Sequence, residues 1–231
     1  MSKLCIITAR GGSKRIPRKN IKDFLGKPII AYSIEVATKS GLFDEVMVST
    51  DDPEIADIAT QYGATVPFFR SAENANDFAT TADVLLEVIA AYTKLNQTFD
   101  FVCCIYPTAP LVTAKRLEEG FAKLNQEGIH AVLPVVAFDY PIQRSLKMDD
   151  AQQVLMNWPE HLNTRSQDLP KVYHDAGQWY WLKTNPFVQT GKILNDHTFG
   201  LLLEALEVQD IDNAIDWQLA ELKYKLIQEI K

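Results

Sequence analysis

Four short and almost uninterrupted apolar runs constrain the fold of this chain most strongly. They are LCIIT at 4–8, EVMVST at 45–50, FVCCIY at 101–106 and AVLPVV at 131–136. Runs of this length without polar alternation are typical of parallel strands that are covered on both faces. The sequence therefore predicts a buried, mostly parallel sheet.

Helical patterns fill the segments between these runs, at 28–41, 53–63, 81–95 and 114–126. The first two begin with proline and end with glycine, as helices often do. Strands that alternate with helices favour right-handed crossovers and a doubly wound α/β sheet. In such sheets ligands bind at the carboxyl ends of the strands.

A long polar and aromatic segment at about 137–177 interrupts this pattern. It has no clean helical period, so we interpret it as a lid, a hairpin excursion or a subunit contact. A strand at 178–183 and a helix at about 213–231 close the chain. Without an internal repeat, a low-complexity tract or a linker, residues 1–231 are expected to form a single domain that carries this insertion.

Composition excludes several classes of protein. The formal net charge of −7 argues against nonspecific binding to nucleic acid or to an anionic membrane. The N-terminal segment resembles neither a secretory signal nor a membrane span, so we expect a cytoplasmic protein. The three cysteines lie in apolar runs, which suits small buried side chains better than catalytic or metal-binding thiols.

A cationic loop follows the first expected strand. Between Arg10 and Lys27 there are seven basic residues and one acid, Asp23. Gly11 and Gly12 allow backbone amides to approach an anion closely, and Ser13 adds a hydroxyl. The loop matches neither the Walker pattern nor the dinucleotide fingerprint. It predicts a site for several phosphates, although a solvated loop or a subunit contact stays open.

Six segments in the same order resemble the cytidylyltransferases that activate nine-carbon, sialic-acid-like sugars with CTP. They are ARGGSKRIPRKN at 9–20, LGKPIIAYSI at 25–34, VSTDD at 48–52, the arginine of PFFRS at 67–71, YPTAPL at 106–111 and QDIDNAID at 209–216. The resemblance spans nearly the whole chain. It implies a Rossmann-like nucleotidyltransferase fold, a homodimer in which the insertion is used, and a reaction of Mg²⁺-bound CTP with a 2-keto sugar acid.

The same resemblance assigns the nucleotide-binding residues. Arg10 and Lys19 match cations that bind the triphosphate, while Lys14, Arg15 and Arg18 add supporting charge. The other nucleotide-binding matches comprise the rest of the loop, an arginine that reads the cytosine edge and two residues of the base pocket, namely Gly11, Gly12, Ser13, Asn20, Arg70, Ala79 and Thr81.

Asp210 and Asp212 match paired aspartates that hold magnesium, and with Arg10 and Lys19 they complete the expected catalytic set. Spaced by two in an extended segment, both carboxylates would project to one side, and Mg²⁺ prefers such oxygen ligands. The alternative is that Asp212 caps the helix that begins near Asn213.

Departures from the sialic acid pattern concern the sugar. YHDAGQWYW at 173–181 stands where those enzymes read roughly R-x-N-G-A-x-Y, and Tyr106 stands where they typically have Gln. Both features resemble the branch that acts on pseudaminic acid. Altered polar residues are expected for a change of sugar, because a different pattern of sugar hydroxyls needs different polar partners. Arg165 is assigned to the sugar carboxylate, and the other expected sugar-binding residues are Tyr106, Pro107, Thr108, Arg144, His174, Asp175 and Gln178.

Some alternatives stay open. Arg144 fits a solvent-facing role equally well, and His174 with Asp175 could instead shape a strand edge. Trp158, Trp179 and Trp181 are expected in the core rather than against a ligand ring. Sialic or legionaminic acid is the alternative sugar, and a nucleotide-sugar glycosyltransferase or a noncatalytic nucleotide sensor is the alternative class of protein.

Overall fold

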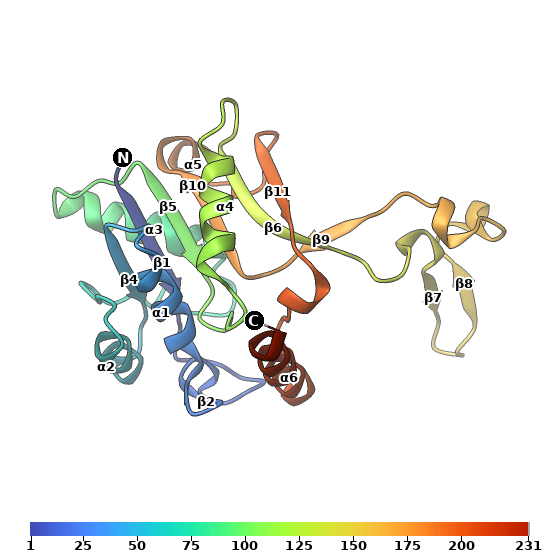
Figure 1. Cartoon of the computed structure of the whole chain (residues 1–231), viewed down its shortest axis with the longest axis horizontal. Helices are drawn as coiled ribbons and strands as arrows, with labels where there is room; N and C mark the ends of the chain where they lie inside the picture. Colours follow the sequence, from blue (N-terminus) through green and yellow to red (C-terminus); the bar gives the residue numbers. More distant parts are fainter. Residues whose placement is uncertain (231) are drawn as a thin grey trace.

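The four apolar runs form strands of one seven-stranded sheet in the computed structural model, which describes residues 1–230. They are β1 (Lys3–Thr8), β4 (Glu45–Ser49), β5 (Phe101–Ile105) and β6 (Ala131–Ala137). The order across the sheet is β11-β6-β10-β5-β1-β4, and β1 is parallel to both β4 and β5 (Figure 1). The predicted doubly wound, mostly parallel sheet is confirmed.

Two strands run against the others. β10 (Trp179–Lys183) lies antiparallel between β5 and β6, and β9 (Tyr173–Asp175) pairs antiparallel with β6. β11 (Thr198–Leu202), which the sequence did not predict, extends the sheet parallel to β6. The antiparallel β10 brings the segment from Asp175 to Lys183 into the middle of the sheet, next to the end of β5.

Helices cover both faces of the sheet, as predicted. Cys5 and Ile7 of β1 pack with α1 (Ile29–Ser40), α2 (Pro53–Gln61) and α4 (Ala114–Leu124), whereas Leu4 and Ile6 pack with α3 (Thr81–Lys94) and α5 (Thr184–Thr190). Short 3₁₀ turns lie at Lys19–Ile21, Ile142–Arg144, Pro159–His161, Ser166–Asp168 and Ala205–Glu207. Within residues 1–230, every helix is too short or too polar to span a lipid bilayer.

An aromatic cluster ties the last helix to the beginning of the chain. Trp217 and Tyr224 of α6 (Ala214–Ile230) pack edge-on against Phe24, with ring centroids 5.6 and 5.9 Å away. Phe24 lies in β2 (Asp23–Phe24), which pairs with β3 (Lys27–Pro28). This packing brings the segment before α6 against the loop that follows β1.

Residues 138–172 form an arm that leaves the body between β6 and β9 (Figure 1). It carries a hairpin of β7 (Leu146–Met148) and β8 (Val154–Met156). The predicted excursion is therefore present and includes a hairpin. Trp158 lies in this arm and is 37% exposed, so its assignment to the core is wrong, because the arm projects away from the packed body.

Trp179 and Trp181, in contrast, are fully buried as predicted, and Gly120 of α4 lies against both indole rings. A Cβ atom at Gly120 would approach Trp179 to 2.5 Å. Trp181 is also held by a hydrogen bond from its Nε1 to the carbonyl of Leu117, 3.0 Å long. The helix can approach the sheet this closely only with glycine at this position.

We therefore expect Gly120→Ala to destabilise the protein. Overpacking costs about 1–3 kcal/mol, and this exceeds the helix-propensity gain of about 1 kcal/mol. Thermal unfolding should show a midpoint lowered by about 2–6 °C. Gly12→Ala, where a Cβ atom would meet nothing within 4 Å, is the matched control and should unfold near the wild-type temperature. Equal midpoints for the two variants would contradict this packing.

Candidate active site

A cavity of about 440 Å³ opens at the carboxyl ends of β1 and β5. Three segments form its wall: the loop after β1, the residues from 70 to the start of α3, and the turn after β5. Most of the predicted nucleotide residues and the first sugar residues line this one cavity, namely Arg10, Ser13, Lys19, Asn20, Arg70, Ala79, Thr81, Tyr106, Pro107 and Thr108.

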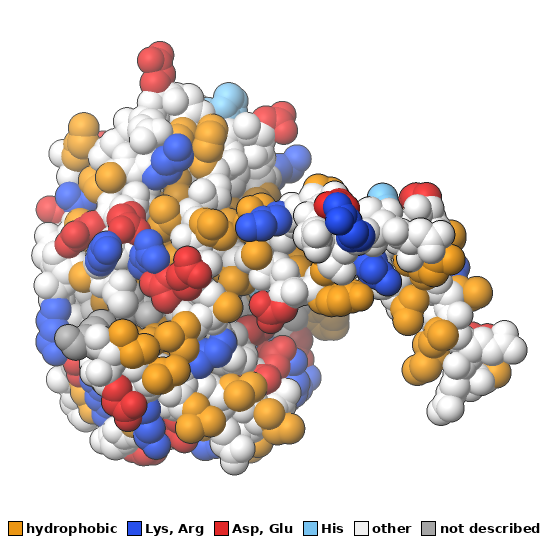
Figure 2. Space-filling model, turned by 45° about the vertical axis from the view of Figure 1, so that its right-hand side comes forward, with side chains coloured by type: hydrophobic (Ala, Val, Ile, Leu, Met, Phe, Trp, Pro, Cys, Tyr) orange, Lys and Arg blue, Asp and Glu red, His pale blue; other side chains and the backbone are white. Residues whose placement is uncertain are grey.

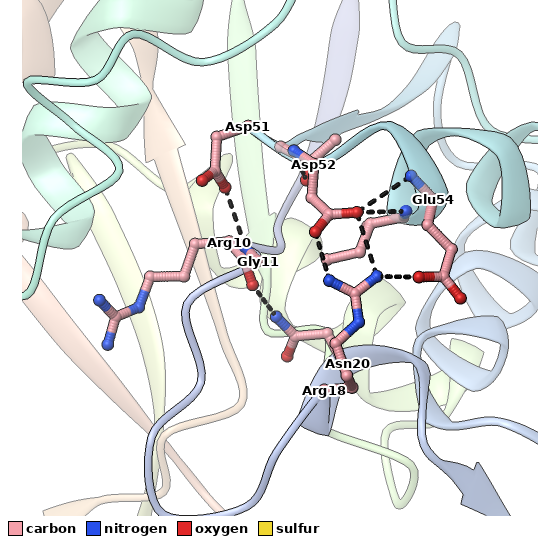
Figure 3. Close-up of polar contacts among 9 residues, drawn as sticks. Arg10, Gly11, Arg18, Asn20, Asp51, Asp52 and Glu54 are labelled. Atoms are coloured by element: carbon pink, nitrogen blue, oxygen red, sulfur yellow. Dashed lines mark hydrogen bonds and ion pairs between the residues drawn. The ribbon is translucent and has the colours of Figure 1, made fainter.

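Carboxylates at the end of β4 hold the cationic loop in place (Figure 3). The amide of Gly11 donates to Asp51 Oδ1 over 2.9 Å, and a Cβ atom at Gly11 would meet Asp52 Oδ2 at 2.6 Å. Asp52 also caps α2 by accepting from the amides of Glu54 and Ile55. The first glycine of the loop is thus required for close approach to Asp52, and its amide is engaged by Asp51.

Arg18 fixes the other end of the same loop. Its guanidinium donates to Asp52 through both terminal nitrogens and also binds Glu54. The side-chain amide of Asn20 donates to the carbonyl of Arg10 over 2.8 Å, which links the two ends of the loop. The Arg10 side chain points away from this cluster (Figure 3). Arg18 was expected to add supporting charge at the anion site. In the structure its guanidinium instead binds Asp52 and Glu54 and so holds the loop in place.

Other cations of the loop have partners that the local sequence does not contain. Arg15 Nη2 lies 2.7 Å from Asp212 Oδ1, and the Lys22 ammonium lies 4.5 Å from the centre of the Trp217 ring. Lys27 pairs with Glu35 over 2.8 Å. The apparent excess of charge is therefore largely balanced by distant segments, and Arg10, Lys14, Arg15 and Lys19 are the loop cations that line the cavity.

Lys19 connects the loop to the C-terminal segment. Its Nζ donates to the carbonyl of Ile211 over 2.7 Å. Burial lowers the pKa of Lys19, and the nearby carboxylates of Asp212 and Asp210 act in the opposite direction. The ammonium group thus lies close to both predicted metal ligands while its side chain lines the cavity.

The helix cap of α6 is Asn213 rather than Asp212. Asn213 Oδ1 accepts from the amides of Ile215 and Asp216, at 2.8 and 3.1 Å, and Asp216 in turn accepts from the amide of Asn213. The alternative role of Asp212 as a cap is wrong, because its carboxylate pairs with Arg15 instead.

The donor set at Asp210 and Asp212 fits a magnesium ion that shares its coordination with a ligand. Ile211 between them is buried, and the two acids are more exposed. Among residues 1–230 no group of three or more His, Cys, Asp or Glu side chains is placed to hold a metal. Mg²⁺ is commonly bound by one or two carboxylates, with substrate phosphates and water completing the shell.

Arg70 is held rigidly in the wall of the cavity, with only 8% of its surface exposed. Its Nε and Nη2 donate to the hydroxyl and the carbonyl of Ser49, at 3.0 and 2.6 Å. Desolvation lowers the pKa of this guanidinium. A buried cation whose position is fixed by the end of β4 can select a ligand with acceptor atoms in one plane.

A chain of hydrogen bonds leads from this cavity toward the expected sugar side. The hydroxyls of Thr81 and Tyr106 lie 2.8 Å apart, and the Tyr106 ring packs on Tyr180 with centroids 5.5 Å apart. Tyr180 donates to Asp175 Oδ2 over 2.7 Å. Burial raises the pKa values of both phenols, which keeps them protonated and able to donate. Tyr180 was not predicted from the sequence as a site residue, because it alternates with two core tryptophans.

Three cavities share wall residues, and we describe them together as one cleft. Thr81 and Tyr106 also line a cavity of about 390 Å³ that contains Asp175 and Tyr180. Asp175 in turn lines a cavity of about 530 Å³ that contains His174 and Asp210. The predicted sugar residues after β5 and in β9 therefore lie along the same cleft as the nucleotide residues.

Six predicted residues do not line this cleft, and one of them, Asp212, pairs with Arg15 of its wall. Gly11 and Gly12 belong to the loop but not to the cavity wall. Gln178 is buried and donates to the carbonyl of Glu207 over 2.6 Å. Arg144 and Arg165 lie in the arm, where Arg165 pairs with Asp168 over 2.7 Å, and Figure 1 shows the arm projecting away from the body.

Comparison with known proteins identifies the family. Residues 4–209 match the sequence model of the family described as cytidylyltransferase. The chain belongs to the cytidylyltransferase family. This cytidylyltransferase is 44% identical over 229 residues to the pseudaminic acid cytidylyltransferase of Campylobacter jejuni, with 99% of each chain covered. The resemblance seen in the sequence motifs is confirmed.

More distant relatives have related names. The CMP-N,N'-diacetyllegionaminic acid synthase of Legionella pneumophila is 34% identical, with 98% of this chain and 97% of the relative covered. The solved structure of CMP:2-keto-3-deoxy-manno-octonic acid synthetase complexed with CTP superposes with a TM-score of 0.70 at 17% identity, covering 99% of this cytidylyltransferase and all of that chain. At that identity the likeness establishes the fold alone.

The ion pair between Arg18 and Asp52 should make the stability of the protein depend on pH. The hydrogen bond from Arg18 lowers the pKa of Asp52 in the folded state. Its stabilising effect should be present at neutral pH and lost as the pH falls below the ordinary value of 3.8. Asp52→Asn keeps a helix cap but loses the charge, so we expect a loss of about 0.5–1 kcal/mol at pH 7, after allowing for solvent screening.

Urea denaturation at pH 7 and near pH 3 would measure this difference. The difference in free energy of unfolding between wild type and Asp52→Asn should be smaller at the lower pH. Glu54→Gln removes the more exposed partner of Arg18 and is the control. It should lower the free energy of unfolding by less than Asp52→Asn does. A gap that is the same at both pH values would show that the Asp52 charge does not hold the loop.

Proposed function

We propose that this cytidylyltransferase transfers CMP from CTP to the anomeric hydroxyl of pseudaminic acid, a nine-carbon 2-keto sugar acid, and releases pyrophosphate. The observation that carries the proposal is the 44% identity over the full length to a pseudaminic acid cytidylyltransferase. The cavity adds support, because the motif cations and Arg70 converge on it from separate segments. Both substrates are soluble metabolites, and we place the reaction in the cytoplasm.

In this proposal the cavity holds CTP with its triphosphate on the loop after β1. Arg10 and Lys19 bind phosphate oxygens, and Ser13 adds a hydroxyl donor. Arg70 donates to the acceptor edge of cytosine, and Thr81 lies beside it at the start of α3. This orientation is supported by the buried, fixed position of Arg70 and by the cluster of cations at the opposite segment of the wall.

The proposed reaction is an in-line displacement at the α-phosphorus. The anomeric oxygen forms a new bond to phosphorus, the bond to the bridging oxygen of the β-phosphate breaks, and the hydroxyl proton is released. Because pyrophosphate leaves with added negative charge, Arg10 and Lys19 stabilise the transition state more than the ground state. Positioning of both substrates in one cleft supplies the remainder of the rate enhancement.

Asp210 and Asp212 are the residues that would hold a magnesium ion in this proposal. Bound there with phosphate oxygens, the ion would neutralise charge on the phosphates of CTP. Lys19 lies near both carboxylates, which supports their placement beside the triphosphate. Arg15, paired with Asp212, holds this carboxylate toward the loop.

The cleft beyond Tyr106 would hold the sugar acid. Its polar groups form a connected set, with Tyr106 bound to Thr81 and Tyr180 bound to Asp175. A site with fixed hydrogen-bonding groups rejects sugars that leave those groups unpaired. The choice of pseudaminic acid rests on the 44% identical relative, and a legionaminic acid sugar is the second candidate because of the Legionella relative.

We further propose that the arm forms a homodimer. Several of its apolar side chains are at least half exposed, and Figure 2 shows hydrophobic side chains along it: Leu146, Met148, Val154, Leu155 and Leu162. An isolated two-stranded hairpin is marginally stable in water, so a second chain that covers this surface would stabilise it. A row on α6 offers exposed apolar side chains as well: Ile215, Leu219, Leu222, Leu226 and Ile230.

Self-association of this kind would also explain the position of two predicted sugar residues. In a twofold dimer each arm contacts the other copy in the same way. Arg144 and Arg165, which lie in the arm and outside the cleft of their own chain, would then be available to the carboxylate of a sugar bound by the second copy. In the proposed dimer, their place in the arm is compatible with their assignment to the sugar.

Pyrophosphate release with CTP and each of three sugars, pseudaminic, legionaminic and sialic acid, tests the proposed function. The rate with pseudaminic acid should exceed the others by on the order of a hundredfold. A preference for another sugar would contradict the choice of substrate but not the transfer of CMP. No release with any sugar, together with binding of a UDP-sugar, would contradict the proposal as a whole.

Lys19→Ala provides the matching test of the site. Loss of a cation at the phosphates should reduce turnover by about 10²–10³-fold while thermal unfolding stays close to wild type. Lys115→Ala removes an exposed lysine of α4 and is the control, with wild-type turnover expected.

Replacement of Leu155 by Asp tests the proposed dimer. A charge in the apolar surface of the arm should convert a dimer to a monomer, as measured by light scattering coupled to gel filtration. Turnover should fall together with the dimer if the arm completes the sugar site. A wild-type protein that is monomeric at micromolar concentration would contradict the proposal directly.

A further inference from the structure

Asp77 places a negative charge inside the cavity that we assign to a triphosphate. Its Oδ1 accepts from Arg10 Nη1 over 2.6 Å, and its Oδ2 pairs with the Lys14 ammonium. Asp77, Arg10 and Lys14 all line the cavity, and among the described residues of its wall Asp77 is the acidic one. Two of the cations expected to bind phosphates are therefore already neutralised by a carboxylate of the same chain.

A rigid turn presents this carboxylate. Asn76 Oδ1 accepts from the amides of Phe78 and Ala79, at 2.7 and 3.0 Å, and its side-chain nitrogen donates to the carbonyl of Glu73 over 2.6 Å. Ala79, at the end of this turn, lines the cavity as well. The position of Asp77 is thus set by local hydrogen bonds and does not depend on a freely rotating surface segment.

The ion pairs of Asp77 contribute little to folding. The side chain of Asp77 is 37% exposed and that of Arg10 is 35% exposed. Ion pairs at this level of exposure are screened by water and salt and add little to the stability of the folded state. Their main effect is on the binding of other anions, which must compete with Asp77 for Arg10 and Lys14.

We propose that Asp77 is an exchangeable counter-ion that occupies Arg10 and Lys14 while the cavity is empty, gives them up to the triphosphate, and returns to them as pyrophosphate leaves. The inference rests on the proposed function. In it, Asp77 is a positioning residue: it holds two cations in place before the substrate arrives and lowers the affinity of the cavity for phosphates. The benefit to the enzyme is weaker retention of pyrophosphate after each turnover.

This arrangement distinguishes between ligands. A ligand that reaches Arg10 and Lys14 must displace the carboxylate, whereas a nucleoside without phosphates leaves the ion pairs intact. Removing the charge at position 77 should therefore tighten the binding of CTP and pyrophosphate and leave that of cytidine unchanged.

Titration calorimetry with inorganic pyrophosphate, CTP and cytidine tests the proposal on Asp77→Asn. We expect the Kd values for pyrophosphate and CTP to fall on the order of tenfold, and that for cytidine to stay constant. Inhibition of turnover by added pyrophosphate should strengthen by a similar factor. Glu73→Gln removes one charge from the same segment without an ion pair to the loop, and it should behave as wild type. Asp77→Ala should shift the constants in the same direction.

Unchanged or weaker binding of pyrophosphate by both Asp77 variants would overturn the proposal, as would an equal gain in Glu73→Gln, which would reflect net charge alone. Because inorganic pyrophosphate is used as a probe, the result separates from the proposed function. A protein that shows the Asp77 effect with pyrophosphate but releases none from CTP would contradict the function and support the counter-ion.

Discussion

The pairing of the loop after β1 with the carboxylates after β4 is the interaction on which the site depends. Asp51 accepts a hydrogen bond from the amide of Gly11. Asp52 accepts from the guanidinium of Arg18 and also caps α2. A loop this rich in cations would repel itself in isolation. Because both ends of the loop are tied to the segment after β4, Arg10 and Lys19 are directed into the cavity at little further entropic cost.

A second contact completes the site from the far end of the chain. The aromatic cluster of Phe24, Trp217 and Tyr224 fixes α6 against β2. The segment before α6 then reaches Lys19, whose ammonium binds the carbonyl of Ile211. Residues separated by 192 positions in the sequence thus meet beside the same cavity, and the proposed metal ligands are placed by hydrophobic packing as much as by their own charge.

Local patterns predicted most of the fold. The apolar runs and capped helices corresponded to β1, β4, β5, β6 and the helices between them, because each pattern reflects burial by its immediate neighbours. The antiparallel direction of β10 and the existence of β11 depend on long-range pairing, which short windows do not encode. Trp158 was misplaced for the same reason: its aromatic character suggested burial, but the arm that carries it has no core of its own.

Motif order predicted the candidate site better than charge did. The resemblance selected Arg10, Lys19, Arg70 and Thr81, which all line the cavity. Charge counting within the loop suggested an excess of cations, yet acids that balance them come from other segments, including Asp52, which is 34 residues from Arg18, and Asp212 near the end of the chain. Asp77 and Tyr180 carried no signal in the sequence analysis, because their significance lies in partners that only the folded chain brings near.

The position of the bound nucleotide is the central feature of the proposed site. A crystal structure of the protein with CTP and Mg²⁺ would measure it. The triphosphate should lie against Arg10 and Lys19, with cytosine at Arg70 and the metal at Asp210 and Asp212. A nucleotide bound in the reverse orientation, or outside the cavity at the carboxyl ends of β1 and β5, would contradict it.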